Sequence, residues 1–384
     1  MKVTVTVGGQ FHAFELARQL QKRGCLELLI TGYPRCKVDG FDLPPEKVVS
    51  LPLGQAFYRG WRRLPAPLRN LADPVYRSSE LFDRQASRRL AGGDLLVGWS
   101  SFSLRTLREA KRRGMKTILE RGSSHILHRQ QILREEYDLV GCRGTLAHPS
   151  IVEKELREYE EADFIAVPST YARDSFIRRG VSPGKIIRCS LGVNLNDFQK
   201  VSLNDSVFRV IFAGCLCLRK GLQYLLQAFR ELKLPGSELL LVGSVLPETK
   251  PLLRRYAGTF KYIDSVSGSR LYEYYSRGTV FVMPSIDDGF GMVILQAMAC
   301  GLPVICTDHT GGLDIVEEGK NGFIVPIRDV EALKAKLLQL YRDPDLRREL
   351  GEQAKQKVRR GFSWDDYGKR VIGEYRRILG ESSR

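Results

Sequence analysis

The chain has 384 residues, of which 43% are hydrophobic, and its formal net charge at pH 7 is +16. This length exceeds what one domain usually holds, so we expect two domains, each with a large hydrophobic core. Most of the positive charge lies in residues 1–200, which favours anionic lipid or phosphorylated ligands as partners. Nucleic acid is excluded as an expected partner, because the sequence carries neither a nucleic-acid-binding module nor a pattern of stacking aromatic residues.

The eight cysteines and the N-terminal residues indicate the compartment. No two cysteines have C-x-x-C spacing, and Cys215-Leu216-Cys217 fits neither a zinc site nor a redox motif. We therefore expect reduced, structural thiols. Residues 1–7 alternate like a strand and lack the apolar core of a signal peptide, so the chain is predicted to be cytoplasmic.

The chain opens with a predicted strand over 2–7, a turn at Gly8-Gly9 and a helix over 11–22, and a second strand follows over 28–31. A glycine turn between a strand and a helix can cradle an anion, or it can simply be a tight turn. The spacing alone leaves both interpretations open for Gly9.

Residues 56–71 contain four arginines, several aromatic and leucine side chains and no acidic residue. This composition is typical of a segment that lies on anionic lipid, although a solvated basic loop is nearly as consistent with it. We expect the segment to contact the cytoplasmic face of a membrane peripherally.

Further strands are predicted over 94–98 and 116–120, with a helix over 105–113 between them. The loop after the second strand contains His125 and should lie at the carboxyl end of the sheet, where ligands bind in parallel α/β folds. His125 could contact a substrate hydroxyl or transfer a proton, and it could equally cap the following helix. From the residues alone, the capping role is slightly favoured.

An acid-rich helix is predicted over 151–161, and a strand over 164–168 follows it. Glu155 and Glu158 in this helix are interpreted as solvated or paired with neighbouring arginines. Ser169 is predicted to cap the next helix, because serine is a preferred N-cap residue.

The second half begins with a predicted strand over 208–213, a loop that ends in Arg219-Lys220-Gly221 and a helix over 222–232. An arginine can fork onto phosphate oxygens, a lysine adds a compact charge, and the helix N-terminus adds N–H donors. A single cation would usually be solvated, but two beside a glycine at such a turn predict contact with a phosphate.

We expect the site to be organised around residues 279–312, which read as a strand over 279–283, a helix over 292–300 and a strand over 304–307. Strands joined through a helix in this way run parallel. The loops that follow the two strands should therefore meet at the carboxyl-end edge of the sheet, and the first of these loops contains Asp288.

Gln296 is the one strongly polar side chain in the otherwise apolar helix over 292–300. A buried amide has to be paired, either with nearby backbone or with a bound ligand, and periodicity leaves both open. Gly289 and Gly291 precede the helix, so a ligand can come close to its unpaired N–H groups and positive dipole end. An anion or a sugar phosphate is the expected guest.

Two features near the C-terminus receive structural interpretations. Asp343-Pro344-Asp345 has the D-x-D form of a metal motif, but Asp343 is predicted to be a helix N-cap with Pro344 in the first turn. No metal site is therefore expected there. A final amphipathic helix is predicted over 364–379, docked across the domain boundary.

Four groups of residues together resemble glycosyltransferase family 4, whose members are retaining enzymes of the GT-B fold. The resemblance is specific in the second half of the chain and looser in the first. The matching groups are Gly214…Arg219-Lys220-Gly221, Pro284-Ser285…Asp288-Gly289-Phe290-Gly291, Q-A-M-A-C-G-L-P-V from Gln296 to Val304, and Gly311-Gly312.

The resemblance implies an α/β protein with two Rossmann-like domains whose parallel sheets face a cleft. It implies an acceptor-side domain over 1–195, a linker over 196–206, a donor domain over 207–362 and a helix over 363–384 that crosses back. The implied activity is transfer of a sugar from a nucleotide-sugar donor to a hydroxyl of a glycan or lipid-linked acceptor, in surface polysaccharide or glycolipid synthesis. Neither a cofactor nor a divalent metal is implied.

The resemblance also assigns roles residue by residue. It gives the donor diphosphate to Arg219 and Lys220, the hydroxyls of the transferred sugar to Asp288, and the ribose to Gln296. His125 resembles in position the first-domain histidine near the transferred sugar, which makes Asp288, His125, Arg219 and Lys220 the implied catalytic residues. The backbone expected to line the donor is that of Gly9, Gly289, Phe290, Gly291, Met292 and Val293.

The sequence departs from the family pattern at three positions. The usual pair of glutamates, separated by seven residues, is Asp288 and Gln296 here. Asp288 keeps the charge with a shorter reach, and Gln296 keeps hydrogen bonding without charge. Cys215 stands where an arginine often follows the glycine of the phosphate loop.

Negative charge on a departing diphosphate can be met by fixed cations and helix-end N–H groups. A double displacement would need a carboxylate nucleophile, and the sequence offers no convincing one, which favours front-face substitution. Two other functions stay open: a GT-B module that binds nucleotide sugar without turnover, and a GT-B epimerase. A nicotinamide-dependent dehydrogenase is disfavoured, because no G-x-G-x-x-G opens a βαβ unit.

Overall fold

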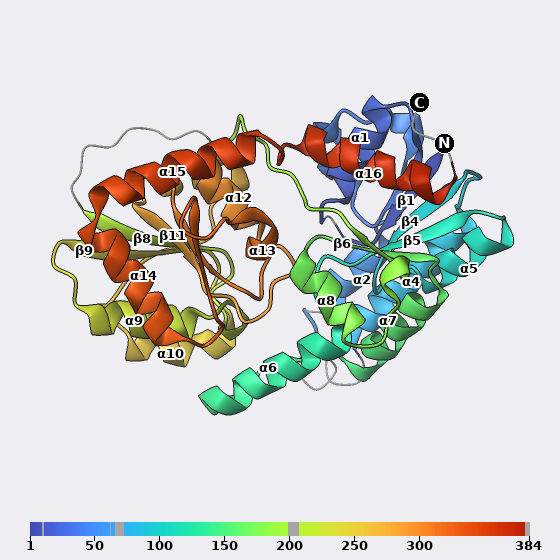
Figure 1. Ribbon diagram of the computed structural model, residues 1–384. Coiled ribbons are helices and arrows are strands. Elements are labelled where there is room, and N and C mark those ends of the chain that lie inside the picture. The colour runs from blue at the N-terminus through green and yellow to red at the C-terminus, as the bar shows by residue number, and fades with distance from the viewer. Residues whose placement is uncertain (10, 62, 66–72, 199–206, 381–384) are drawn as a thin grey trace.

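The computed structural model describes residues 1–384 except 10, 62, 66–72, 199–206 and 381–384. Figure 1 shows two α/β lobes side by side, the first lobe built from the N-terminal half of the chain and the second from the C-terminal half. Each lobe has its own parallel sheet covered by helices. The predicted α/β architecture with two parallel sheets is confirmed.

The first lobe contains a parallel sheet with the strand order β3-β2-β1-β4-β5-β6-β7 among the described residues. The central strands β1 and β4 are buried along their whole length, which explains the continuous apolar run of β4, whereas β1 buries Thr4 and Thr6 between its valines. The strands are β1 (Val3–Val7), β2 (Leu26–Thr31), β3 (Val48–Ser50), β4 (Leu95–Trp99), β5 (Lys116–Glu120), β6 (Phe164–Val167) and β7 (Ile186–Arg188). The helices are α1 (Ala13–Lys22), α2 (Leu53–Trp61), α4 (Pro74–Arg88), α5 (Leu104–Arg112), α6 (Ile126–Val140), α7 (Pro149–Glu161) and α8 (Thr170–Ile177).

The second lobe contains a parallel sheet with the order β10-β9-β8-β11-β12-β13 in the described ranges. Its strands are β8 (Phe208–Ala213), β9 (Ser237–Val242), β10 (Lys261–Ile263), β11 (Val280–Met283), β12 (Val304–Thr307) and β13 (Gly322–Val325). Its helices are α9 (Leu222–Leu232), α10 (Lys250–Arg255), α11 (Leu271–Ser276), α12 (Met292–Ala299), α13 (Gly312–Ile315), α14 (Val330–Arg342) and α15 (Pro344–Arg359), and α16 (Trp364–Ile378) follows them.

The predicted βαβ unit over 279–312 is present as β11, α12 and β12. Helix α12 is largely buried because it packs between the sheet and α15. It ends where Gly301 takes a left-handed conformation, with φ of 73°. Within the described part of the chain, no helix combines the length and the apolar character needed to cross a bilayer.

The chain crosses between the lobes at two places that touch each other. Val193 pairs with Ser363 in a short parallel bridge, and its N–H donates to the carbonyl of Phe362 at 2.7 Å. Gly192 has to be a glycine there, because a Cβ would lie 2.6 Å from the backbone nitrogen of Trp364. Residues 199–206, most of the predicted linker, lie outside the described residues.

Helix α16 returns to the first lobe and packs along α1, as Figure 1 shows. The ammonium of Lys22 and the guanidinium of Arg23 both bind Asp365, at 2.7 and 3.1 Å. The Ser363 side chain caps α16 and forms a reciprocal capping box with Asp366. The predicted amphipathic character and N-terminal start of this helix agree with the structure.

Candidate functional site

Loops at the carboxyl ends of strands in both sheets line one cleft of about 520 Å³. The first lobe contributes the residues after β4 and β5 together with one side of α6. The second lobe contributes Arg219, Asp288 and Gly289. Three of the residues predicted for the site therefore lie together between the lobes.

The loop after β8 holds two cations against the loop after β11. The Arg219 guanidinium donates to the backbone carbonyl of Asp287 at 2.6 Å and lies 3.9 Å from the Asp288 carboxylate, and the Lys220 ammonium contacts that carboxylate directly. Gly221, with φ of 68°, allows this approach, because a Cβ there would overlap the carbonyl of Pro284.

The electrostatics around Lys220 suit an anion. Burial, followed by the neighbouring positive charge of Arg219, lowers the pKa of Lys220 to about 7. An anion bound beside the two cations would favour the charged form of the lysine. The charges of this cluster therefore suit a phosphate group, and binding of a phosphate would be coupled to proton uptake by Lys220.

Asp288 lies just before the N-terminus of α12, with Gly289, Phe290 and Gly291 between them. Its carboxylate accepts from the backbone N–H of Phe290 at 3.1 Å. Gly291 has φ of 78°, a left-handed conformation that favours glycine. The predicted glycine-rich entry to the helix is therefore built as expected.

Gly289 is a point of contact between the lobes. A Cβ at Gly289 would lie 2.2 Å from the carbonyl oxygen of Gly122 in the first lobe. The Ser169 hydroxyl donates to the Gly289 carbonyl at 2.5 Å and also caps α8, as predicted. The predicted donor loop is thus held directly against the first lobe.

Other predicted donor residues are absent from the described lining of this cleft. The Gln296 side chain is half-buried and accepts from the Tyr275 hydroxyl at 3.3 Å. Neither Gln296 nor Gly9 is among the described residues that line the cleft, and residue 10 lies outside the described residues. Phe290 is buried, whereas Met292 and Val293 are half-buried. Their donor-binding roles stay predictions.

His125 is the N-cap of α6. Its ring is buried, with 4% exposure, and its Nδ1 accepts from the backbone N–H of Leu127 at 3.2 Å. The capping interpretation is confirmed, while a part in catalysis stays a prediction. Burial, followed by the positive charge of Arg121, lowers the pKa of His125 to about 4.

The low pKa of His125 predicts an acid-sensitive contribution to stability. The unfolded chain binds a proton at this residue near pH 6.5 and the folded chain only near pH 4, so stability falls as pH drops through this window. Between pH 7.5 and 5, we expect a loss of about 2 kcal/mol from this residue. Urea unfolding of His125→Asn, which keeps a capping side chain, should show a correspondingly smaller loss. An equal loss in both proteins would contradict the prediction.

Sequence reasoning missed the role of Asp287. This side chain is fully buried between the lobes, where it accepts from the Ser124 hydroxyl at 2.5 Å and the Tyr171 hydroxyl at 2.8 Å. The Arg129 guanidinium lies 3.7 Å away. Burial raises the pKa of Asp287, but Arg129 and the hydroxyl donors outweigh it, and the pKa lies below its ordinary value. Two adjacent acids in a loop between Ile286 and Phe290 were the available signal.

The interpretation of Glu155 and Glu158 as solvated side chains is wrong. Both carboxylates are buried, because they lie on the same face of α7 as Ile151 and Tyr159. Glu155 binds the Arg121 guanidinium at 2.8 Å, so the pairing alternative holds for it. Glu158 instead accepts from the backbone N–H groups of two residues after β4, at 2.6 and 2.8 Å. These carboxylates fix the first-lobe wall of the cleft.

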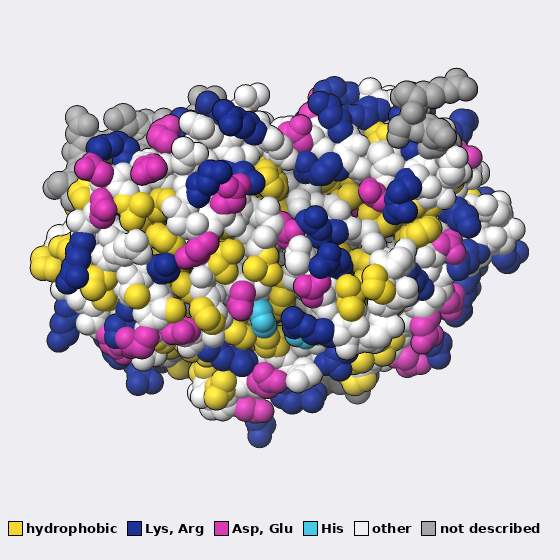
Figure 2. All heavy atoms as spheres, viewed as in Figure 1, with side chains coloured by type: hydrophobic (Ala, Val, Ile, Leu, Met, Phe, Trp, Pro, Cys, Tyr) yellow, Lys and Arg dark blue, Asp and Glu magenta, His cyan; other side chains and the backbone are white. Residues whose placement is uncertain are grey.

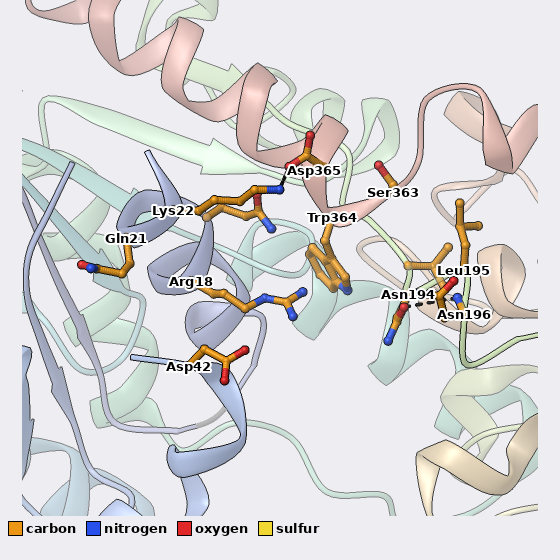
Figure 3. A pocket seen from close by; sticks show the side chains of 12 residues that line it. Arg18, Gln21, Lys22, Asp42, Asn194, Leu195, Asn196, Ser363, Trp364 and Asp365 are labelled. Carbon is orange, nitrogen blue, oxygen red and sulfur yellow. Dashed lines mark hydrogen bonds and ion pairs between the residues drawn. The ribbon is translucent and has the colours of Figure 1, made fainter. Parts of the chain in front are cut away.

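A second cavity, of about 580 Å³, lies where the two crossings meet the first lobe. In Figure 3, the Arg18 side chain of α1 points toward Trp364 at the start of α16, and Asn194 and Asn196 lie beside them. The residues predicted for the donor site are absent from the described lining of this cavity. This cavity is formed by α1 and the two crossing segments and not by the loops that line the cleft.

Two further predictions concern metal and membrane. Asp343 caps α15 by accepting from the Leu346 N–H at 2.8 Å, as predicted, and the described residues contain no group of three potential metal ligands.

In the basic segment 56–71, residues 62 and 66–71 lie outside the described residues. Leu53 in the preceding turn of α2 is 57% exposed. Figure 2 shows basic side chains spread over both lobes and histidines where the lobes meet. Membrane contact stays a prediction.

Residues 194–357 match the family model of glycosyl transferases group 1. The second lobe is therefore similar to the domain that this family model describes. A similar relative is the capsular polysaccharide biosynthesis glycosyltransferase CapM of Staphylococcus aureus, 32% identical over 187 residues, which are 47% of this chain and 48% of CapM. The O-antigen chain mannosyltransferase B of Escherichia coli is 28% identical over 246 residues, which are 59% of this chain and 64% of that protein. The chain thus spans about half to two thirds of these relatives.

Solved glycosyltransferase structures share the whole two-lobed architecture. The sucrose-phosphate synthase of Thermosynechococcus elongatus superposes with a TM-score of 0.74 at 21% identity, over 100% of both chains. HepE of Anabaena, solved in complex with UDP, superposes with a TM-score of 0.68 at 17% identity, over 98% of this chain and 99% of HepE. The two lobes of this chain therefore have the GT-B fold.

Proposed function

We propose that the protein is a retaining glycosyltransferase that moves a sugar from a nucleotide-sugar donor to a hydroxyl of a glycan or lipid-linked acceptor. The observation that carries the proposal is the pairing of Arg219 and Lys220 with Asp288 at the edge of the interlobe cleft. A diphosphate leaving group needs fixed positive charge at that place. The names of CapM and the mannosyltransferase support a role in surface polysaccharide or glycolipid synthesis.

In the proposed reaction, the second lobe would bind the donor and the first lobe would position the acceptor. Arg219, Lys220 and the N-terminus of α12 would stabilise charge on the departing diphosphate. Asp288 would exchange its contact with Lys220 for hydroxyls of the transferred sugar once the diphosphate is bound. The first-lobe loop at Gly122 would bring the acceptor to the same point, because it touches Gly289.

The carboxylates of the cleft support front-face substitution. Among the described residues that line it, the acids are Glu155 and Asp288, and both are already engaged by protein groups. Glu155 also accepts from the Tyr159 hydroxyl at 2.7 Å, so it is poorly placed to attack an anomeric carbon. In the proposed mechanism, the leaving phosphate helps to deprotonate the acceptor hydroxyl and the anomeric configuration is retained.

The test is a panel of nucleotide sugars, with released nucleotide and retained binding measured separately, each with and without EDTA. We expect one donor to give nucleotide release that EDTA leaves unchanged and that Lys220→Ala slows about 100- to 1000-fold. Binding without release across the panel would favour the alternative of a binding module. Formation of an epimeric nucleotide sugar in place of release would favour the epimerase. A sugar covalently trapped on the enzyme would contradict the front-face mechanism.

Membrane contact through residues 56–71 is a second part of the proposal. Helix α2 lies beside the glycine turn of the first lobe, because the Gln55 amide donates to the Gly8 carbonyl at 2.9 Å. An anionic membrane held at α2 would therefore lie near the first-lobe side of the site. This position suits delivery of a lipid-linked acceptor.

A further inference from the structure

The cavity of about 580 Å³ at the two chain crossings, here called the crossing cavity, shares none of its described lining residues with the cleft. It is lined by α1, by Asp42 and by the crossing segments 193–196 and 363–365. Its volume lies in the range of sites that bind small molecules. The crossing cavity is therefore large enough to hold a ligand of its own.

The described lining of the crossing cavity has no excess charge. Arg18 and Lys22 supply two cations, and Asp42 and Asp365 supply two acids. A phosphate or a polycation would therefore find no net charge of the opposite sign to attract it. Two aliphatic side chains, both from segment 193–196, are too few for a site that binds an apolar ligand. These features favour a ligand that is neutral and polar.

Several polar groups of this lining have no partner within the described part of the protein. The side chains of Asp42, Asn196 and Trp364 make no hydrogen bond or ion pair with described residues. The Arg18 guanidinium pairs with the Glu15 carboxylate at 2.6 Å, whereas its Nε is buried and makes no hydrogen bond. The cavity thus offers both donors and acceptors. A hydroxyl group can donate and accept, so a polyhydroxylated ligand can satisfy both kinds of group.

Trp364 adds an aromatic surface to these polar groups. Its side chain is half-buried at the start of α16, and its ring meets the Tyr367 ring edge-on, with 5.4 Å between the centroids. In Figure 3, the indole lies between Arg18 on one side and Asn194 and Asn196 on the other. The C–H groups of a sugar ring pack on an aromatic face, because the partial negative charge of that face attracts them. An indole among amide, carboxylate and guanidinium groups therefore matches a sugar.

We propose that the crossing cavity is a binding site for a neutral saccharide. The Trp364 indole packs on the apolar face of a sugar ring, and Arg18, Asp42 and Asn196 bind its hydroxyls. The site lies outside the cleft, so it goes beyond the proposed sugar transfer and does not depend on it. A glycan bound there would be held on the protein independently of the cleft.

The test is saturation-transfer NMR of the full chain with neutral disaccharides of glucose, galactose, mannose and N-acetylglucosamine. We expect at least one disaccharide to bind with a dissociation constant in the millimolar range or below, which a titration then measures. Thermal unfolding shows that the protein in these samples is folded. Absence of binding to the folded protein by every disaccharide, at concentrations of tens of millimolar, overturns the proposal.

Variants of Trp364 test the aromatic contact. Trp364→Ala should weaken binding about tenfold, whereas Trp364→Phe keeps a ring and should weaken it less. Neither change touches Ser363 or Asp366, which form the capping box of α16, so the helix should keep its start. Thermal unfolding of both variants checks this. Equal affinity in the parent protein and in folded Trp364→Ala places the saccharide elsewhere and overturns the assigned site.

Asp42→Ala and Asn196→Ala test the hydroxyl contacts at little cost in stability, because both side chains are exposed and lack partners among the described residues. Each should weaken binding about 2- to 10-fold, as expected for the loss of one hydrogen bond. Asp39→Ala is the matched control, since Asp39 is an exposed acid nearby in the chain and outside the described lining. It should leave the affinity unchanged. Equal affinities in all three variants overturn the hydroxyl contacts.

Lys220→Ala separates the crossing cavity from the cleft and should leave the saccharide affinity unchanged. Loss of binding in Lys220→Ala, with binding retained in Trp364→Ala, would place the saccharide in the cleft and overturn the proposal. Binding that depends on Trp364, without nucleotide release from any nucleotide sugar, leaves the saccharide site standing and counts against the proposed transferase. The two proposals can therefore fail separately.

Discussion

Lys220→Ala should lower kcat about 100- to 1000-fold while changing the KM of the donor much less. This range is typical for the loss of one group that stabilises charge developing in a transition state. The lysine is held in position by Asp288 and lies beside Arg219, and a bound diphosphate would favour its charged form. Steady-state kinetics with the donor identified from the panel provide the measurement.

Lys334→Ala is the matched control, because Lys334 also pairs with acids but does so on α14, at Glu231 and Glu331. It should leave both constants unchanged. Lys220→Arg keeps the positive charge and should recover part of the lost rate. A Lys220→Ala enzyme with normal kcat and a raised KM would show that the lysine binds ground state and transition state equally, against the assigned role.

Asp287→Ala should destabilise the protein by about 3–5 kcal/mol, because it leaves Arg129 without its buried partner and removes the acceptor for two hydroxyls. The free energy of unfolding in urea, followed by both far-UV circular dichroism and tryptophan fluorescence, measures this loss. Asp287→Asn keeps an acceptor for the hydroxyls and should lose less.

Asp343→Ala is the reference variant, because Asp343 stabilises only the start of α15 as its N-cap. The loss of unfolding free energy in Asp287→Ala is compared with the loss in this variant. Loss of such a cap costs about 1 kcal/mol. If Asp287→Ala costs no more than Asp343→Ala, the buried cluster between the lobes is not a major source of stability. A split into two unfolding transitions in Asp287→Ala alone would instead show that the residue couples the lobes.

Features with a local cause could be predicted from the sequence. The β11–α12–β12 unit follows from apolar runs and glycine stops, and the caps at His125, Ser169 and Asp343 follow from their positions before helices. The cation pair at Arg219 and Lys220 could be recognised because a strand, a glycine and a helix surround it within a few residues.

Features that depend on contact between distant segments could not be predicted. Asp287 and Asp288 are adjacent and of one residue type, yet the first is buried among first-lobe side chains and the second faces the cleft cations. Nothing in their spacing distinguishes them. In α7, Glu155 and Glu158 lie at helical spacing from Ile151 and Tyr159, which places all four on one buried face. This spacing could have predicted burial, but charged side chains are usually expected to be solvated.

The bridge between Val193 and Ser363 has a consequence for movement. Because both covalent crossings pass close to it, we expect the lobes to separate by a rotation about an axis near this bridge. Glu136 of α6 binds Gln223, Tyr224 and Arg328 of the second lobe at 2.5 to 2.8 Å, while Asp287 lies at the inner loops. These contacts between the lobes would have to break before the lobes move apart. We therefore expect the rate at which they break to limit substrate entry and product release.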